Sequence, residues 1–194
     1  MVMVGTDPVE VERQLRGGGL GCPCGGGLGP WGHARERTVR GVGPVRPRRA
    51  RCGSCLATHV LLAVSCLLRR ADGVEAIGAA LRLKATGVGH RPIAAVVGRP
   101  PSTVRGWLRA FARNAEAVRA RCTVLLAAFD PLAGPTPARS CPFADAVEAV
   151  GACAAAARRR LGPVGAVSPW QTAAGITDGL LLAVALAAEP TNTN

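Results

Sequence analysis

Apolar positions with a helical period of about 3.6 residues dominate the middle of the chain, from residue 60 to residue 129. This pattern predicts successive helices, among them one over 72–86 and one over 114–129. The longest apolar runs, Val60–Leu68 and Leu180–Ala188, are much shorter than the ~20 residues that a bilayer span requires. We therefore interpret both runs as buried helices and expect no membrane partner.

The flanking segments have a different pattern. Residues 1–20 form an N-terminal arm with room for a short helix, and residues 21–59 are rich in Gly, Pro, Arg and Cys but lack long apolar runs. A Pro- and Gly-rich linker is expected over 130–142. An Ala-rich region over 143–188 predicts helices at 143–160 and 170–188, followed by a polar tail, 189–194.

The segment from His90 to Arg113 fits two helices joined by a tight turn. Ala94 is small where the second helix must approach, and Gly98 stands where the turn requires a left-handed backbone. The helix at 72–86 would support this pair through Val74, Ile77 and Leu81. The second helix has an apolar stripe at i, i+3, i+4 and i+7, formed by Val104, Trp107, Leu108 and Phe111. The sequence therefore predicts a three-helix helix-turn-helix domain over 60–129.

The opposite face of the second helix is polar and basic, which suits insertion into a DNA major groove. Arginine can bond guanine edges with two hydrogen bonds, and Ser or Thr can reach bases or phosphates. We expect base recognition by Ser102, Thr103, Arg105 and Arg109. Phosphate contacts are expected from Arg99, Arg113 and the segment 46–51, which contains Arg46, Arg48, Arg49 and Arg51. The alternative is an ordinary helical hairpin with a solvated basic face.

Four of the eight cysteines form two close pairs, Cys22 with Cys24 and Cys52 with Cys55. Paired thiols beside glycine are typical of the turns that hold tetrahedral zinc, and four protein ligands would make that zinc structural. The C-x-C pair is one residue shorter than the usual knuckle, so His33 or His59 could replace one thiol. Metal would also explain how a segment with so little core folds. The alternative is incidental cysteines.

Residues 1–20 lack the apolar core of a signal peptide, so we expect a cytoplasmic, nucleoid-associated protein with reduced thiols. The other four cysteines, Cys66, Cys122, Cys141 and Cys153, are interpreted as small buried residues. The expected fold is mainly α: a zinc-ribbon-like segment over 21–59, the helix-turn-helix domain, and C-terminal Ala-rich helices.

The charge distribution favours a polyanionic partner. The chain has a net charge of +12, although its abundant Ala, Gly and Arg are typical of a high-GC genome, which enriches Arg whatever the function. The charge is uneven, however: residues 1–121 carry 20 Arg and Lys against 7 Asp and Glu, whereas residues 122–194 carry 4 against 5. Genome bias would spread the arginines more evenly, so the basic surface belongs to the first two thirds.

The order W-G-H-A-R-E-R-T-V-R-G, R-P-R-R-A-R-C-x-x-C-x-x-T-H-V-L-L and R-P-I-A-A-V-V-G-R-P-P-S-T-V-R-G-W-L-R resembles a group of actinobacterial helix-turn-helix proteins of unknown function. Over about residues 20–115 it is also similar to the N-terminal zinc-ribbon and helix-turn-helix region of insertion-sequence transposases. The resemblance implies sequence-specific binding to double-stranded DNA, with Cys22, Cys24, Cys52 and Cys55 as zinc ligands.

The resemblance does not extend to catalysis. Carboxylate-class transposases need three acidic residues on an α/β core to hold two metal ions, whereas the acidic residues after 113 lie in helical or linker segments. The GGG runs at 17–19 and 25–27 lack the Lys and Ser or Thr of a phosphate-binding loop. We therefore expect that this protein has no enzymatic activity.

Three functions remain open. The first is a DNA-binding regulator or mobile-element accessory factor, whose residues 130–194 would suit the formation of a homodimer. The second is a protein-interaction module with an incidental basic face. The third is the non-catalytic targeting half of a transposase, which would pair with a catalytic chain.

Overall fold

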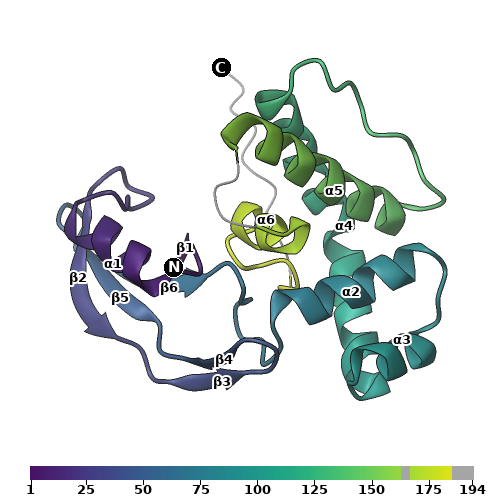
Figure 1. Cartoon of the computed structure of the whole chain (residues 1–194), viewed down its shortest axis with the longest axis horizontal. Helices are drawn as coiled ribbons and strands as arrows, with labels where there is room; N and C mark the ends of the chain where they lie inside the picture. Colours follow the sequence, from purple (N-terminus) through teal and green to yellow (C-terminus); the bar gives the residue numbers. More distant parts are fainter. Residues whose placement is uncertain (163–166, 185–194) are drawn as a thin grey trace.

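The computed structural model describes residues 1–162 and 167–184, and within them the chain forms six helices and six strands. Helices account for most of the regular structure, in agreement with the expected mainly-α fold. Figure 1 shows two ends: strands and one helix at the left, and a group of helices at the right. No helix among the described residues combines the length and apolarity needed to cross a bilayer.

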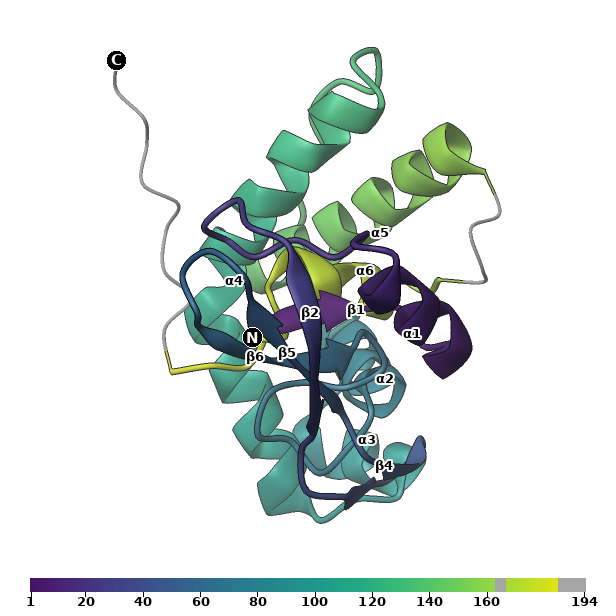
Figure 2. The ribbon, with the colours of Figure 1, turned by 90° about the vertical axis from the view of Figure 1, so that its left-hand side faces the viewer.

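The strand-containing end is a four-stranded sheet in the order β1-β6-β5-β2. Its strands are β1 (Val2–Val4), β2 (Leu28–His33), β5 (Arg48–Cys52) and β6 (Thr58–Ala63). Strand β1 runs parallel to β6, whereas β2, β5 and β6 are antiparallel neighbours. Helix α1 (Pro8–Arg16) lies to one side of this sheet (Figure 2) and packs Val11 and Leu15 onto a small core with Leu28, Ala50 and Leu61.

A two-stranded hairpin leads from the sheet to the helices. It consists of β3 (Arg37–Val39) and β4 (Gly43–Val45), which lie low in Figure 1, between the two ends. Its tip is joined to the chain before the first helix of the group, because the Arg40 N–H donates to the Ala71 carbonyl and the Gly73 N–H donates to the Arg40 carbonyl. The N–H and the carbonyl of Arg40 therefore both attach the hairpin to residues 71–73.

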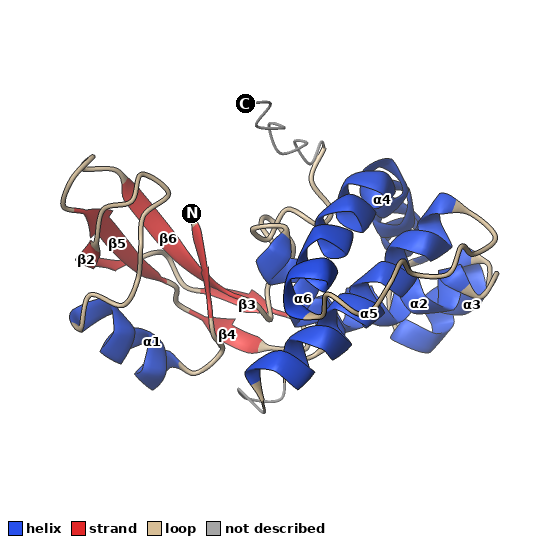
Figure 3. Ribbon diagram, turned by 90° about the horizontal axis from the view of Figure 1, so that it is seen from above, coloured by secondary structure: helices blue, strands red, loops and turns tan. Residues whose placement is uncertain are grey.

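The helical end has a larger core of its own. It comprises α2 (Val74–Ala85), α3 (His90–Val97), α4 (Pro101–Phe129), α5 (Pro142–Leu161) and α6 (Pro169–Ile176), seen together at the right of Figure 3. Phe111 is fully buried and meets Phe143 edge to face, with ring centroids 4.8 Å apart. Elsewhere in this core, Gly78 of α2 lies directly against the ring of Trp170 of α6. A Cβ at Gly78 would lie 2.1 Å from that ring, so only glycine fits there.

Most of the predicted helices are confirmed. The helices expected over 72–86 and 143–160 are α2 and α5, and the helix expected over 114–129 is the continuation of α4. The inner stripes are buried as predicted: Val74, Ile77, Leu81, Val104, Trp107, Leu108 and Phe111.

Two expectations about local structure are wrong, and a third is incomplete. Val60–Leu68 is not a helix: Val60 to Ala63 belong to β6, which is hydrogen-bonded between β1 and β5, and turns follow. A short apolar run does not distinguish a central strand from a buried helix. The helix expected over 170–188 ends at Ile176, because Asp178 and Gly179 both adopt positive φ, and residues 185–188 and the tail 189–194 lie outside the described residues. Within residues 1–20 the structure contains the short helix that was expected, α1, and adds the strand β1, which the sequence pattern did not indicate.

Candidate metal centre and basic surfaces

The four paired cysteines meet in one cluster, with all four sulfur atoms within 4.8 Å of one another. The Sγ atoms of Cys22 and Cys55 are 3.7 Å apart, and those of Cys24 and Cys52 are 3.5 Å apart. A tetrahedral site with metal–sulfur distances of ~2.3 Å has sulfur–sulfur edges of ~3.8 Å. The four thiols therefore have the spacing that one tetrahedral metal ion requires.

The two turns that hold these cysteines approach each other unusually closely. In the first turn the Cys22 N–H donates to the Gly26 carbonyl, and Gly25 has a φ of 86°. A Cβ at Gly26 would lie 2.8 Å from the sulfur of Cys52 and 2.5 Å from the Ser54 hydroxyl. Only glycine fits between the turns, so the C-x-C segment reaches the C-x2-C segment although it is one residue short.

Backbone hydrogen bonds favour the thiolate form of Cys52. The N–H groups of Cys55 and Ser54 donate to its sulfur at 3.5 and 3.3 Å, which lowers the pKa of Cys52 to about 6. For Cys22, a backbone N–H of Cys24 favours the thiolate, but burial and the neighbouring thiols outweigh it and raise the pKa to about 12. Four sulfurs this close cannot all ionise without a cation among them.

Neither histidine is needed as a ligand. His59 is buried beside the cluster, with its Nε2 3.3 Å from the sulfur of Cys22, so it can donate a hydrogen bond to that ligand. His33 is exposed at the end of β2 and is not part of the cluster. The predicted set of Cys22, Cys24, Cys52 and Cys55 is thus brought together, and it can hold a metal ion.

The segment His90–Arg113 contains two helices, α3 and the first half of α4, joined by a three-residue turn. Gly98 adopts the left-handed conformation, with a φ of 63°, and its N–H closes the end of α3. Ile93 and Ala94 are buried against α4, while Ala95 and Val96 face solvent. An open hollow lies at this turn, lined by Arg91, Ala95, Gly98, Arg99 and Pro101 among others.

The first half of α4 has two unlike sides. Val104, Trp107, Leu108 and Phe111 face the core, whereas Ser102, Arg105, Gly106, Arg109 and Arg113 are exposed and Thr103 is half-buried. Arg105, Arg109 and Arg113 recur every four residues, so they form a row about 12 Å long at 1.5 Å per residue. Within the described residues these three guanidinium groups have no ion-pair partner and no hydrogen-bond acceptor.

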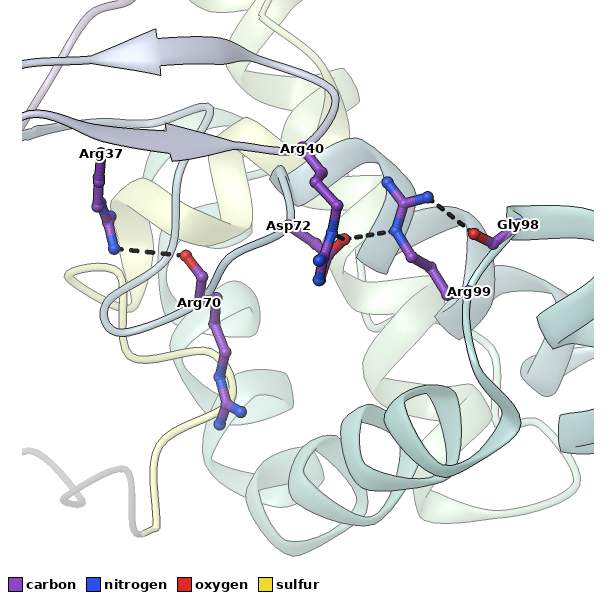
Figure 4. A network of polar contacts seen from close by, with 6 residues as sticks. All are labelled: Arg37, Arg40, Arg70, Asp72, Gly98 and Arg99. Carbon is purple, nitrogen blue, oxygen red and sulfur yellow. Dashed lines mark hydrogen bonds and ion pairs between the residues drawn. The ribbon is translucent and has the colours of Figure 1, made fainter.

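Arg99 does not belong to this free row. Its Nε atom lies 2.5 Å from a carboxylate oxygen of Asp72, and its Nη1 donates to the Gly98 carbonyl (Figure 4). The other partner of Asp72 is Arg40 at the hairpin tip, which makes two hydrogen bonds of 2.8 Å to the carboxylate. Asp72 therefore joins the hairpin to the turn between α3 and α4, a role that the sequence pattern did not indicate.

The segment 46–51 divides between two sides of the sheet. Arg48 is not available for phosphates, because it forms an ion pair with Glu12 of α1 and donates to the Gly32 carbonyl. Arg46 and Arg49 are exposed, and Arg51 lies 4.6 Å over the ring of Trp31. Strand alternation explains this division, since successive side chains point to opposite faces.

Comparisons with known protein families, with curated proteins and with solved structures found no match to this chain.

Proposed function

We propose that this protein binds double-stranded DNA in a sequence-specific manner, with α3 and the first half of α4 as its helix-turn-helix. The observation that supports this most directly is the row of Arg105, Arg109 and Arg113, which is exposed and has no partner in the described part of the chain, on a helix whose other side is in the core. A helix face of this length and charge fits the major groove, where arginine bonds the O6 and N7 atoms of guanine.

The packing around the row also suits this function. A recognition helix must be held firmly at one side while its N-terminal residues remain free. Here α2 and α3 both pack against α4, and the left-handed Gly98 makes the turn that a helix-turn-helix requires. Ser102 and Thr103 lie in the first turn of α4, where they would contact bases or phosphates.

The cysteine cluster would hold a structural zinc ion. Four thiolates at these separations match the preference of zinc for tetrahedral sulfur ligands, and they leave no open position for a substrate. Zinc would fasten β5 and β6 to the C-x-C turn at an end of the protein whose apolar core is small. The metal thus would stabilise the sheet, and we propose no catalytic role for it.

The biological role that fits these features is a transcriptional regulator or an accessory factor of a mobile element. The basic face could also be incidental to a protein-binding role. DNA selection distinguishes the two, because only a DNA reader enriches a sequence and depends on individual arginines of α4.

The test is selection from a random duplex pool at several salt concentrations, followed by sequencing and by binding isotherms. Arg105→Ala should cost ~1–3 kcal/mol at one base position of the enriched motif. The matched control is Arg158→Ala, which removes the same charge from an exposed position near the end of α5 and should leave the motif unchanged. Failure to enrich any motif, or equal losses for both variants, would refute the proposal.

A further inference from the structure

The outer face of the sheet has an exposed aromatic ring among arginines. The inner face of β5 is covered, because Ala50 and Cys52 are buried in the core under α1. Arg49 and Arg51 alternate with them and therefore point to the outer face. Their cross-strand partners on β6 are Val60 and Thr58, which share that face.

Trp31 of β2 lies beside Arg51 on this surface. Its side chain is 51% exposed, whereas Trp107 and Trp170 of the helical core are 3% and 4% exposed. The pairing of β2 with β5 shifts register between Pro30 and His33, and Gly32 has a φ of 101°. Such a bulge re-aims a side chain, and here the ring ends up against the Arg51 guanidinium, 4.6 Å from its centroid.

The charge around Trp31 selects the ligand. Strands β2, β5 and β6 contain no Asp or Glu, and the exposed Glu36 lies three residues beyond the end of β2. Among the described residues, the carboxylate that pairs with a β5 arginine is Glu12 of α1, and its partner is Arg48, on the face that α1 covers. An exposed indole beside arginines, on strands without carboxylates, is the combination that binds unpaired nucleotides, because the ring stacks on a base while arginines hold phosphates.

We infer that the outer face of the sheet, formed by Trp31, Arg49 and Arg51, is a second nucleic-acid site that binds single-stranded nucleic acid by stacking a base on Trp31. Duplex bases already stack on each other, so the flat sheet reaches a base only where a strand is unpaired. This site uses no residue of α4, and it therefore stands whether or not α4 reads duplex DNA.

Intrinsic fluorescence tests the stacking directly, because Trp31 is the only exposed tryptophan of the chain. Titration of the full-length protein with a twelve-nucleotide oligo(dT) should quench the exposed component of the emission. The same titration with an abasic oligomer, which keeps the phosphates but lacks bases, should give little quenching. Equal quenching by both oligomers would contradict base stacking.

Variants separate the ring from the charge. Trp31→Ala should weaken the binding of labelled oligo(dT) by about tenfold or more, and Trp31→Phe should retain most of the affinity because the aromatic face remains. Arg49→Ala should reduce the salt dependence of binding, whereas Arg158→Ala on α5 is the control of equal charge. Wild-type affinity in Trp31→Ala would overturn the inference.

The two nucleic-acid sites are distinguishable in the same experiment. Arg105→Ala should impair duplex selection and leave oligo(dT) binding intact, and Trp31→Ala should do the reverse. Comparison of oligo(dT) with oligo(U) identifies whether DNA or RNA is preferred. Loss of single-strand binding in Arg105→Ala but not in Trp31→Ala would assign all binding to α4 and refute the second site.

Discussion

Replacement of Asp72 by asparagine should reveal how strongly the hairpin and the helical end depend on one carboxylate. The Asp72 side chain is only 4% exposed and accepts three hydrogen bonds, two from Arg40 and one from Arg99. Asp72→Asn keeps the shape, removes the charge, and leaves one acceptor oxygen for two arginines.

The expected cost follows from the exposure of the partners. Hydrogen bonds to a charged group contribute ~1.5–3 kcal/mol each, and breaking a fully buried ion pair costs ~3–5 kcal/mol. Arg40 is 54% exposed and can be hydrated again, whereas Arg99 is 21% exposed and loses more. We therefore expect Asp72→Asn to lower the free energy of unfolding by about 2–3 kcal/mol.

Denaturant unfolding followed by circular dichroism at 222 nm measures this change in the helical end. The hydrogen bond from Arg40, opposed in part by burial and reinforced by Arg99, lowers the pKa of Asp72 in the folded protein. A depressed carboxyl pKa contributes stability above the unfolded value of ~3.9, and this contribution is lost as the pH falls through the folded pKa. The gap between wild type and Asp72→Asn should thus be constant above about pH 5 and close in stronger acid.

Comparison of the two proteins removes the effect of the thiols, because acid also protonates the cysteines in both. A gap below about 0.5 kcal/mol at pH 7, or one that persists unchanged through pH 3, would refute the role assigned to this carboxylate.

Four other predictions concern the metal, the turn, the core and the sheet. In protein loaded with Zn²⁺, a chelator should unfold the sheet end, which hydrogen exchange of the β5 and β6 amides would detect, and it should leave most of the circular dichroism signal at 222 nm unchanged. Full protection of these amides after chelation would contradict a structural ion. Gly98→Ala should destabilise the protein by about 1 kcal/mol, measured by thermal unfolding, because φ is 63° there; an unchanged Tm would contradict this strain. Gly78→Ala should cost about 3 kcal/mol or more and change the near-ultraviolet spectrum of Trp170, since its Cβ would overlap that ring; a wild-type spectrum would contradict the packing. Arg48→Ala should lower the midpoint of denaturant unfolding because the ion pair with Glu12 is lost, with little change in affinity for oligo(dT), whereas Arg49→Ala should weaken oligo(dT) binding and leave the midpoint unchanged; the reverse result would exchange the two faces of β5.

The helices were predictable because each one has a single buried stripe. The positions of Val104, Trp107, Leu108 and Phe111 define the inner side of α4 from spacing alone, and all four are buried. The cysteine cluster was predictable for a similar reason, since two short Cys pairs beside glycines leave few arrangements. Local periodicity and local turns carry this information.

The errors fall where distant pairing decides the structure. Residues 60–63 have an apolar run that suits a helix, but β1 and β5 lie on either side and make a central strand. The N-terminal β1 has only three residues and is a strand because β6 is there to pair with it. No pattern within such a short segment contains that information.

The roles of the arginines could not be read from sequence either. Arg48, Arg49 and Arg51 look equivalent in the run of basic residues, yet their partners are Glu12 for Arg48 and Trp31 for Arg51, while Arg49 is exposed. Strand alternation predicts two faces but does not say which face α1 covers. Only the packing of α1 decides that Arg48 stabilises the fold while Arg49 and Arg51 remain at the outer surface.

The role of Asp72 in connecting the sheet end to the helical end also depends on packing between distant segments. One basic surface lies on the sheet, which has a small core, and the other lies on α4, which belongs to the large helical core. Use of both surfaces in one complex would require a fixed relative position of the sheet and α4. The hairpin β3–β4 meets that need, since backbone bonds hold Arg40 to Ala71 and Gly73, while Asp72 between them also binds Arg99. Asp72 therefore forms ion pairs both with an arginine of the hairpin and with an arginine of the turn before α4. Arg99, which was expected to contact phosphates, therefore connects the hairpin to the turn before α4 through Asp72. The exposed arginines of α4, Arg105, Arg109 and Arg113, then lie on a helix whose position relative to the hairpin is fixed.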